Sequence, residues 1–401
     1  MKILQINAVY KNASTGRICY ELHNFLVNNG NECFTIYGNN KGHYADTCYT
    51  GNIITQKAHA LLTRITGKIG YFSTEQTGRV IRFIKQYNPD VVHLHNLHGN
   101  YINIPKLLKY LGNNDIPTVV TLHDCFFYTG GCTHYTVNNC YKWHDECGNC
   151  KYNKLTWFFD KTEKMLSDKK KMFGRIKRLG VIGVSKWITG EAELSPVFKN
   201  AQIIKSIYNG IDLNTFRQKE SDFKEKHGLQ DCKIILGVAS GWTEKKGLNV
   251  FLEISDKLRE NERIVLVGNI PDKIVSDKII FIPATNNVEE LVNIYNAADI
   301  FLQTSKEETF GNVVAEALAC GVPVITNTYT ANPELVSREC GIVVENFAAD
   351  SILNAIRKVL CDGKEYYSEN CIKFAKENFN SDANLSQVLD VYKGLAGKKV
   401  Y

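Results

Sequence analysis

Short apolar runs that alternate with segments of helical periodicity are the feature that most limits what this chain can fold into. Each run is four to seven residues long and rich in Ile, Val and Leu, which is typical of buried strands. In the first half of the chain the runs lie at residues 2–8, 32–37, 91–94, 118–122 and 181–184. In the second half they lie at residues 233–239, 263–267, 278–282, 299–303 and 322–325. Strands that alternate with helices form parallel sheets, so the pattern predicts an α/β fold.

The length of the chain, 401 residues, predicts two domains, because a single hydrophobic core seldom grows so large. Turn-forming residues at 209–212 follow a strand and indicate the joint. We expect a first domain at 1–210, a second domain at 211–375, and a C-terminal helix at 376–401 that packs back on the first domain. Ligands of such sheets bind beyond the carboxyl ends of the strands, so two facing units predict one deep cleft.

Composition and charge narrow the class of protein. Hydrophobic residues make up 44% and charged residues 22%, ordinary values for a globular protein. The net charge of +6 and the pI of 8.5 are mild, whereas a nucleic-acid-binding domain is expected to have a pI above about 9. The chain opens without a signal-peptide pattern and has no apolar run of about 18 residues. We therefore expect a cytoplasmic protein with no membrane-spanning helix, with its 13 cysteines mostly reduced and with no nucleic-acid partner.

The segment 305–324 carries the most information about chemistry. It reads as a strand end, a loop, a helix that begins near Asn312, and a turn at Gly321 before another strand. The start of a helix offers free backbone N–H groups and a positive dipole end, which together suit a phosphate group. Glu308 comes just before the helix and Glu316 lies inside it, where carboxylates can accept hydrogen bonds from sugar hydroxyls. The alternative is a solvated helix with two favourably placed charges.

This segment resembles the E-x7-E motif of the retaining glycosyltransferases of family 4, which have the GT-B fold. Further matches to the family lie at 184–185, at 209–212, and at 296–299 together with Ser305. The resemblance implies two Rossmann-like domains that face each other across a cleft. It also implies an enzyme that moves a hexosyl unit from a nucleoside-diphosphate sugar with retention of anomeric configuration.

The resemblance assigns roles to residues of this segment. Glu316 is expected to hold the ribose of the nucleotide, and Glu308 is expected to face the donor sugar as a catalytic residue. The donor sugar and its phosphates are expected to lie against the residues between the two glutamates, chiefly against their backbone, and these are Phe310, Gly311, Asn312 and Val313.

A second phosphate element follows the strand at 233–239. A lysine at a strand-to-helix turn can neutralise a departing diphosphate, and Lys246 matches the catalytic lysine of the family. The family's arginine position falls on Gly241, which has no charge, and Lys245 is our candidate substitute. The alternative is that Lys245 and Lys246 are an ordinary solvated pair.

Three positions in the first domain are candidates for the site. Gly16 lies in the expected first β-to-α loop, where a glycine lets the backbone approach a phosphate. His123 ends a strand and matches the family's histidine beside the donor sugar, although a structural hydrogen-bonding role is the alternative. His98 is a candidate for the acceptor side, and His93 is expected to face the core.

An irregular insertion at 125–152 is rich in cysteine. Its sulfur atoms suggest a structural zinc site with four ligands, Cys132, Cys140, Cys147 and Cys150. The alternative is a set of reduced thiols in a loop packed by Trp143, Tyr141 and Phe126, while disulfides are disfavoured in a cytosolic chain.

A lysine-rich stretch at 160–180 has eight basic residues interleaved with apolar ones. A helix of this kind can lie on an anionic membrane surface, which would place the protein at the inner membrane face. The alternative is a solvated helix with a buried apolar stripe.

The chain also resembles glycosyltransferases of the exopolysaccharide or colanic-acid type, and this resemblance implies a role in surface polysaccharide biosynthesis, with a saccharide or a lipid-linked saccharide as acceptor. Such an enzyme needs no catalytic metal or other cofactor if protein cations stabilise the leaving group, and no D-x-D motif stands at a strand end. Two alternatives remain: a GT-B epimerase that acts on the sugar nucleotide itself, and a non-catalytic sugar-nucleotide binder, which the missing arginine supports.

Overall fold

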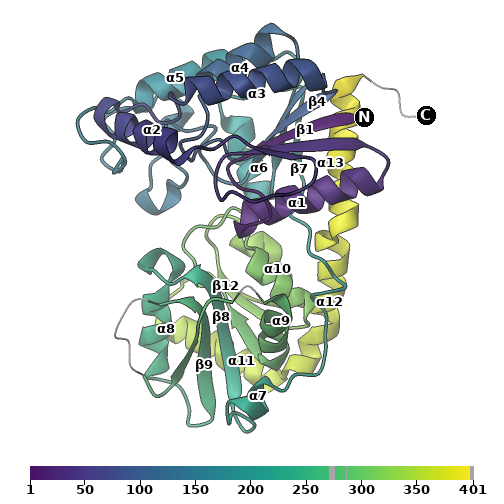
Figure 1. The fold of residues 1–401 in the computed structure, drawn as a ribbon. Helices are drawn as coiled ribbons and strands as arrows, with labels where there is room; N and C mark the ends of the chain where they lie inside the picture. Colours follow the sequence, from purple (N-terminus) through teal and green to yellow (C-terminus); the bar gives the residue numbers. More distant parts are fainter. Residues whose placement is uncertain (271–275, 286, 398–401) are drawn as a thin grey trace. The chain divides into compact units, whose positions relative to one another are not determined.

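A computed structural model describes residues 1–270, 276–285 and 287–397, and they form two compact units. The first unit holds Met1–Ile207 and the chain from Asp382 onward, and the second holds Tyr208–Ser381. Each unit is a parallel sheet with helices packed against it (Figure 1). The prediction of two Rossmann-like α/β domains is confirmed.

The first sheet has seven strands in the order β3-β2-β1-β4-β5-β6-β7, all parallel. They are β1 (Lys2–Asn7), β2 (Glu32–Tyr37), β3 (Thr47–Tyr49), β4 (Val91–Leu94), β5 (Thr118–Leu122), β6 (Leu179–Gly183) and β7 (Ile203–Ser206). The strand order reverses between β1 and β4, and such a switch point opens a crevice at the carboxyl ends of the strands.

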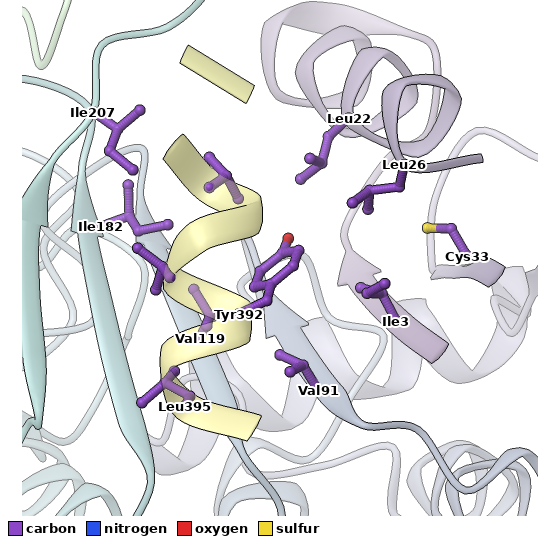
Figure 2. Packing of buried hydrophobic residues seen from close by; sticks show 12 residues of the cluster. Ile3, Leu22, Leu26, Cys33, Val91, Val119, Ile182, Ile207, Tyr392 and Leu395 are labelled. Atoms are coloured by element: carbon purple, nitrogen blue, oxygen red, sulfur yellow. The ribbon is translucent and has the colours of Figure 1, made fainter. Parts of the chain in front are cut away.

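Seven α-helices accompany this sheet in the part of the unit that the structure describes. They are α1 (Ala13–Asn28), α2 (Ile53–Thr66), α3 (Thr74–Tyr87), α4 (Ile104–Asn113), α5 (Thr162–Phe173), α6 (Lys186–Leu194) and α13 (Ser381–Ala396). Figure 2 shows α13 beside α1 and against the strands, where Tyr392 and Leu395 share a core cluster with residues such as Leu22, Val91 and Ile182. The expected terminal segment 376–401 is thus divided, because its residues up to Ser381 belong to the second unit.

The second sheet has six parallel strands in the order β10-β9-β8-β11-β12-β13. They are β8 (Lys233–Gly241), β9 (Glu262–Asn269), β10 (Ile279–Ile282), β11 (Ile300–Leu302), β12 (Val324–Asn327) and β13 (Gly341–Val344). Around them lie α7 (Phe223–Lys226), α8 (Leu248–Ser255), α9 (Val288–Ala297), α10 (Asn312–Ala319), α11 (Ala349–Asp362) and α12 (Lys364–Phe379). The switch point of this sheet lies between β8 and β11.

The lysine-rich stretch departs from its prediction in two ways. The helix α5 ends at Phe173, and the last residues of the stretch enter the buried strand β6. Lys169 is also buried, where its ammonium donates to the carbonyl oxygens of Phe126 and Thr129 and lies 3.8 Å from the centre of the Phe126 ring. Burial lowers the pKa of Lys169 to about 7. Lys169 therefore holds a loop and cannot belong to a basic outer face.

Among the helices of the described ranges, none combines the length and the apolarity needed to cross a membrane.

Candidate active site

Two loops meet at the switch point of the second sheet, one after β8 and one after β11. The carbonyl oxygen of Lys245 accepts from the backbone of Lys306 at 3.0 Å, and that of Lys246 accepts from the Thr304 hydroxyl at 2.6 Å. Gly247 has a φ of +77°, and a Cβ there would stand 2.5 Å from Thr304. The glycine therefore allows the close packing that brings Lys246 and the segment before α10 together.

Lys246 and Glu308 form an ion pair at the centre of these loops. Lys246 Nζ lies 2.5 Å from Glu308 Oε1, and the two side chains are 37% and 18% exposed. The backbone N–H of Glu308 donates to the Thr330 hydroxyl at 2.9 Å, which fixes the chain on which the carboxylate sits. The pair thus brings two functional groups together. The Lys246 ammonium can bind a phosphate oxygen, and the Glu308 carboxylate can accept a hydrogen bond from a sugar hydroxyl.

Gly311 precedes α10 and has a φ of +99°, a backbone conformation that residues other than glycine rarely adopt. Asn312 opens the helix, and its Oδ1 accepts from Asn209 Nδ2 at 3.1 Å. Phe310 is buried against the rings of Tyr208 and Phe379. Its side chain belongs to the core, so only its backbone is suited to the donor role expected of it.

Glu316 is buried in the second turn of α10, with 3% of its surface exposed. Tyr295, from α9, donates its hydroxyl hydrogen to Glu316 Oε2 at 3.0 Å. Burying a carboxylate costs free energy unless hydrogen-bond donors surround it, so Glu316 needs such donors at this position. The ribose role of Glu316 stays a prediction.

The second cation at the donor site also stays a prediction. Gly241 lies at the end of β8, where the register with β9 shifts, and it has no side chain to offer. The Lys245 side chain is exposed next to Lys246. The structure thus leaves Lys245 as the nearest candidate along the chain.

Gly16 lies inside the first turns of α1, and its expected place in the preceding loop is wrong. The helix begins at Ala13, and a Cβ at Gly16 would stand 3.2 Å from both the backbone nitrogen of Lys11 and the side chain of Val9. The glycine lets the loop after β1 fold against the helix, and a donor contact by Gly16 stays a prediction.

A chain of hydrogen bonds joins two histidines at the switch point of the first sheet. His95 and His123 each come one residue after paired strands, β4 and β5. His95 Nδ1 lies 2.9 Å from His123 Nε2, and His95 Nε2 lies 3.1 Å from Gln5 Oε1. Burial lowers the pKa of His95 well below its ordinary value and that of His123 to about 4, so both rings are neutral at pH 7. His93 faces the core, bonded to Tyr392 and Thr121.

Gln5 fixes which nitrogen of each ring carries the hydrogen. Its Nε2 donates to the carbonyl oxygen of Cys19 at 3.1 Å, so its Oε1 must face His95. An amide oxygen only accepts, so His95 Nε2 carries the hydrogen and His95 Nδ1 accepts from His123 Nε2. His123 is therefore held as the Nε2–H tautomer, with its lone pair at Nδ1.

Replacing Gln5 by leucine is expected to remove this tautomer preference. His95 Nε2 then loses its acceptor, and neither of its tautomers is favoured. We expect the nitrogen-15 NMR signals of His123 to change from one protonated and one unprotonated ring nitrogen to averaged values. Tyr392→Phe is the control, because it disturbs the same buried cluster through His93 only. An unchanged His123 spectrum in Gln5→Leu would show that Gln5 does not set the tautomer.

His98 and Asp124 form a second polar pair near these rings. His98 Nε2 lies 2.6 Å from Asp124 Oδ2, and the backbone N–H of Phe126 donates to Asp124 Oδ1 at 2.8 Å. Burial alone would raise the pKa of Asp124, but His98 and the Phe126 N–H together hold it below its ordinary value. The aspartate therefore orients His98, whose acceptor role stays a prediction.

The four cysteines of the predicted zinc site line one cavity of about 310 Å³. Burial, with smaller effects of the other three thiols, raises the pKa of Cys132 to about 12. All 13 cysteines are free thiols. In the ranges that the structure describes, no three His, Cys, Asp or Glu side chains form a group that could hold a metal ion. Zinc binding by this cluster requires the side chains to move together and stays a prediction.

Elemental analysis of protein purified without added metal tests the zinc prediction. We expect about one zinc ion per chain, lost on replacing Cys147 and Cys150 by serine. Cys361→Ser is a matched control, because this cysteine is exposed and lies far from the cluster along the chain. Metal-free protein with every thiol of the cluster reactive would contradict the prediction.

The sequence did not point to several residues that build these two sites. The roles of His95, Gln5, Tyr295 and Thr304 were all missed. Gln5 had a signal, since it is a polar residue inside the apolar run at 2–8. The contacts of Tyr295 and Thr304 depend on packing between distant segments, which no local pattern reports.

Comparison with known proteins places the chain in a family. The model described as "Glycosyltransferase Family 4" matches residues 15–215, half of the chain, and the model "Glycosyl transferases group 1" matches residues 219–378. The uncharacterized glycosyltransferase MJ1607 of Methanocaldococcus jannaschii is 29% identical over 234 residues, which are 53% of this chain and 59% of the relative. The chain therefore covers less than two thirds of that relative's length.

Two further similarities extend over nearly the whole chain. The putative colanic acid biosynthesis glycosyl transferase WcaC of Escherichia coli is 22% identical over 367 residues, 86% of this chain and 87% of the relative. The crystal structure of Anabaena Alr3699/HepE in complex with UDP-glucose superposes with a TM-score of 0.67 at 15% identity, covering 98% of this chain and 100% of that one. This structural likeness shows a shared GT-B fold. Because a family model matches half of its length, the chain belongs to Glycosyltransferase Family 4.

Proposed function

We propose that the protein transfers a hexosyl unit from a nucleoside-diphosphate sugar to a saccharide or lipid-linked saccharide acceptor, with retention, in surface polysaccharide biosynthesis. The observation that carries the proposal is the Lys246–Glu308 pair beside the start of α10, at the switch point of the second sheet. A cation, a helix start and a carboxylate are the groups that a sugar diphosphate needs.

The comparisons support the class of substrate. Anabaena HepE was crystallised with UDP-glucose, and WcaC is named for colanic acid biosynthesis. UDP-sugars are therefore the first donors to test. His123 keeps the role beside the donor sugar that the family resemblance implies, and His98 stays our candidate for the acceptor side.

The proposed reaction breaks the bond between C1 of the sugar and the diphosphate oxygen, and it forms a bond between C1 and an acceptor oxygen. Lys246 and the backbone N–H groups at the start of α10 stabilise the negative charge that grows on the diphosphate. The acceptor oxygen attacks from the face that the diphosphate leaves, and the acceptor proton passes to the departing phosphate oxygen. Glu308 accepts hydrogen bonds from the sugar hydroxyls and holds the ring in place.

A panel of sugar nucleotides tests the proposal. We expect one donor to raise the melting temperature and to release nucleoside diphosphate when a saccharide acceptor is added. The anomeric proton coupling of the product should show the configuration of the donor. An altered sugar nucleotide without any glycoside would indicate an epimerase, and binding without turnover on every acceptor would indicate a non-catalytic binder.

A further inference from the structure

The helix α2 turns an apolar stripe away from its own domain. Ile54, Leu61 and Ile65 recur at helical spacing and share one face of α2. They are 74%, 49% and 37% exposed, whereas His59 and Thr63 on the opposite face are buried. A surface helix normally buries its apolar stripe against its own domain, whereas α2 exposes this stripe.

An aromatic loop continues this stripe. Trp157, Phe158 and Phe159 follow one another and are each more than half exposed, with Phe158 reaching 70%. The loop is attached to α2, because the backbone N–H of Trp157 donates to the carbonyl oxygen of Arg64 at 2.7 Å. The Arg64 guanidinium also lies 5.5 Å from the centre of the Trp157 ring. We refer to the exposed apolar side chains of α2 and of residues 155–159 as the α2 surface, which lies at the edge of its unit remote from α13 (Figure 1).

The two segments that carry the α2 surface have only basic charged residues, and exposed acids stand at their ends, at Glu75, Glu146 and Asp160. Residues 51–74 contain Lys57, Arg64 and Lys68 but no Asp or Glu, and residues 147–159 contain Lys151 and Lys154 but no Asp or Glu. The next acid along the chain, Asp160, is exposed, and its carboxylate accepts from the backbone N–H groups of Cys150 and Thr162. An apolar face with tryptophan and phenylalanine, on segments whose own charges are all basic, is suited to an anionic lipid surface.

We infer that the α2 surface binds the headgroup region of an anionic lipid bilayer. Phe158 and Ile54 enter the apolar boundary of the lipids, while Lys57 and Lys154 meet the phosphates. This surface replaces the lysine-rich stretch at 160–180 as the membrane contact, because Lys169 is buried there and part of the stretch is strand. The inference does not depend on the proposed transferase activity, since it concerns lipid binding without donor or acceptor.

Co-sedimentation with vesicles tests the inference on the full chain. We expect the protein to sediment with vesicles of phosphatidylcholine mixed with phosphatidylglycerol, and much less with phosphatidylcholine alone. Ile54→Ser with Phe158→Ser should lower the partition coefficient about tenfold or more, because both side chains lose apolar area to bury. Lys57→Glu with Lys154→Glu should lower binding to the anionic vesicles by a similar factor and should leave binding to neutral ones unchanged.

Matched controls come from the second unit. Tyr366→Ser removes an aromatic side chain that is 69% exposed, and Lys376→Glu reverses an exposed lysine, and neither should change lipid binding. Thermal melting should show that all variants stay folded. Equal binding by wild type and Ile54→Ser/Phe158→Ser would overturn the inference. So would light scattering that shows a dimer abolished by the same two substitutions, because a second copy of the chain would then cover the surface.

Discussion

Replacing Lys246 by alanine is expected to lower kcat by about 10²–10³-fold, the usual loss when one preorganised group that stabilises developing charge is removed. The KM for the sugar nucleotide should change by less than about tenfold, because the charge on the leaving diphosphate grows only on the way to the transition state. Initial rates at saturating and limiting donor concentrations separate the two constants. A rise in KM with unaltered kcat would show that Lys246 only binds the substrate.

Two variants control for the loss of the ion pair itself. The Glu308 side chain is 18% exposed and loses its cation in Lys246→Ala, so we expect a fall in stability together with the fall in rate. Lys257→Ala breaks another lysine–carboxylate pair of the same unit, Lys257–Asp350 at 2.7 Å, and should leave kcat unchanged. Lys246→Arg retains the charge at the end of a longer, planar group and should recover part of the rate.

The site residues at the carboxyl ends of the strands of the second domain could be predicted from the sequence, because their signals are local. A strand, a glycine with positive φ, a helix start and two glutamates follow one another in a single segment, so their order alone brings Glu308 and Gly311 to one sheet edge. Lys246 follows the same logic, since it comes after the strand that pairs with β11.

What the sequence did not reveal depends on packing between distant segments. Gly16 was expected in a loop, but helical structure extends back to Ala13, with Asn12 at the N-cap position and no side-chain capping hydrogen bond. The edge strand β3, with the sequence TCY, is too short and too little apolar to stand out from a loop, whereas β13, with the sequence GIVV, is apolar and was missed. Lys169 shows the same limit, since a lysine in a basic run is normally solvated, and only the carbonyl groups of residues 126 and 129 explain its burial.

Replacing Glu316 by alanine is expected to weaken the binding of nucleoside diphosphates by about 10–10²-fold, because ribose hydroxyls lose a charged acceptor worth roughly 1.5–3 kcal/mol. Glu316 is buried and bonded to Tyr295, so the substitution also removes a structural contact. Calorimetry with the diphosphate of the best donor measures the affinity, and a melting curve measures the structural cost. Affinity alone does not separate the two effects, so the ligand must be changed as well.

A cycle of protein and ligand changes isolates the ribose contact. The wild type should bind the ribonucleoside diphosphate more tightly than its 2′,3′-dideoxy analogue, which lacks the hydroxyls that Glu316 is proposed to hold. In Glu316→Ala this preference should fall to about 1, because only a direct contact couples the two changes. Tyr295→Phe removes one hydrogen-bond donor to Glu316 but leaves the carboxylate, so it should retain the preference. If Glu316→Ala instead lowers the affinity for both ligands by the same factor, Glu316 supports the fold of α10 and does not bind the ribose.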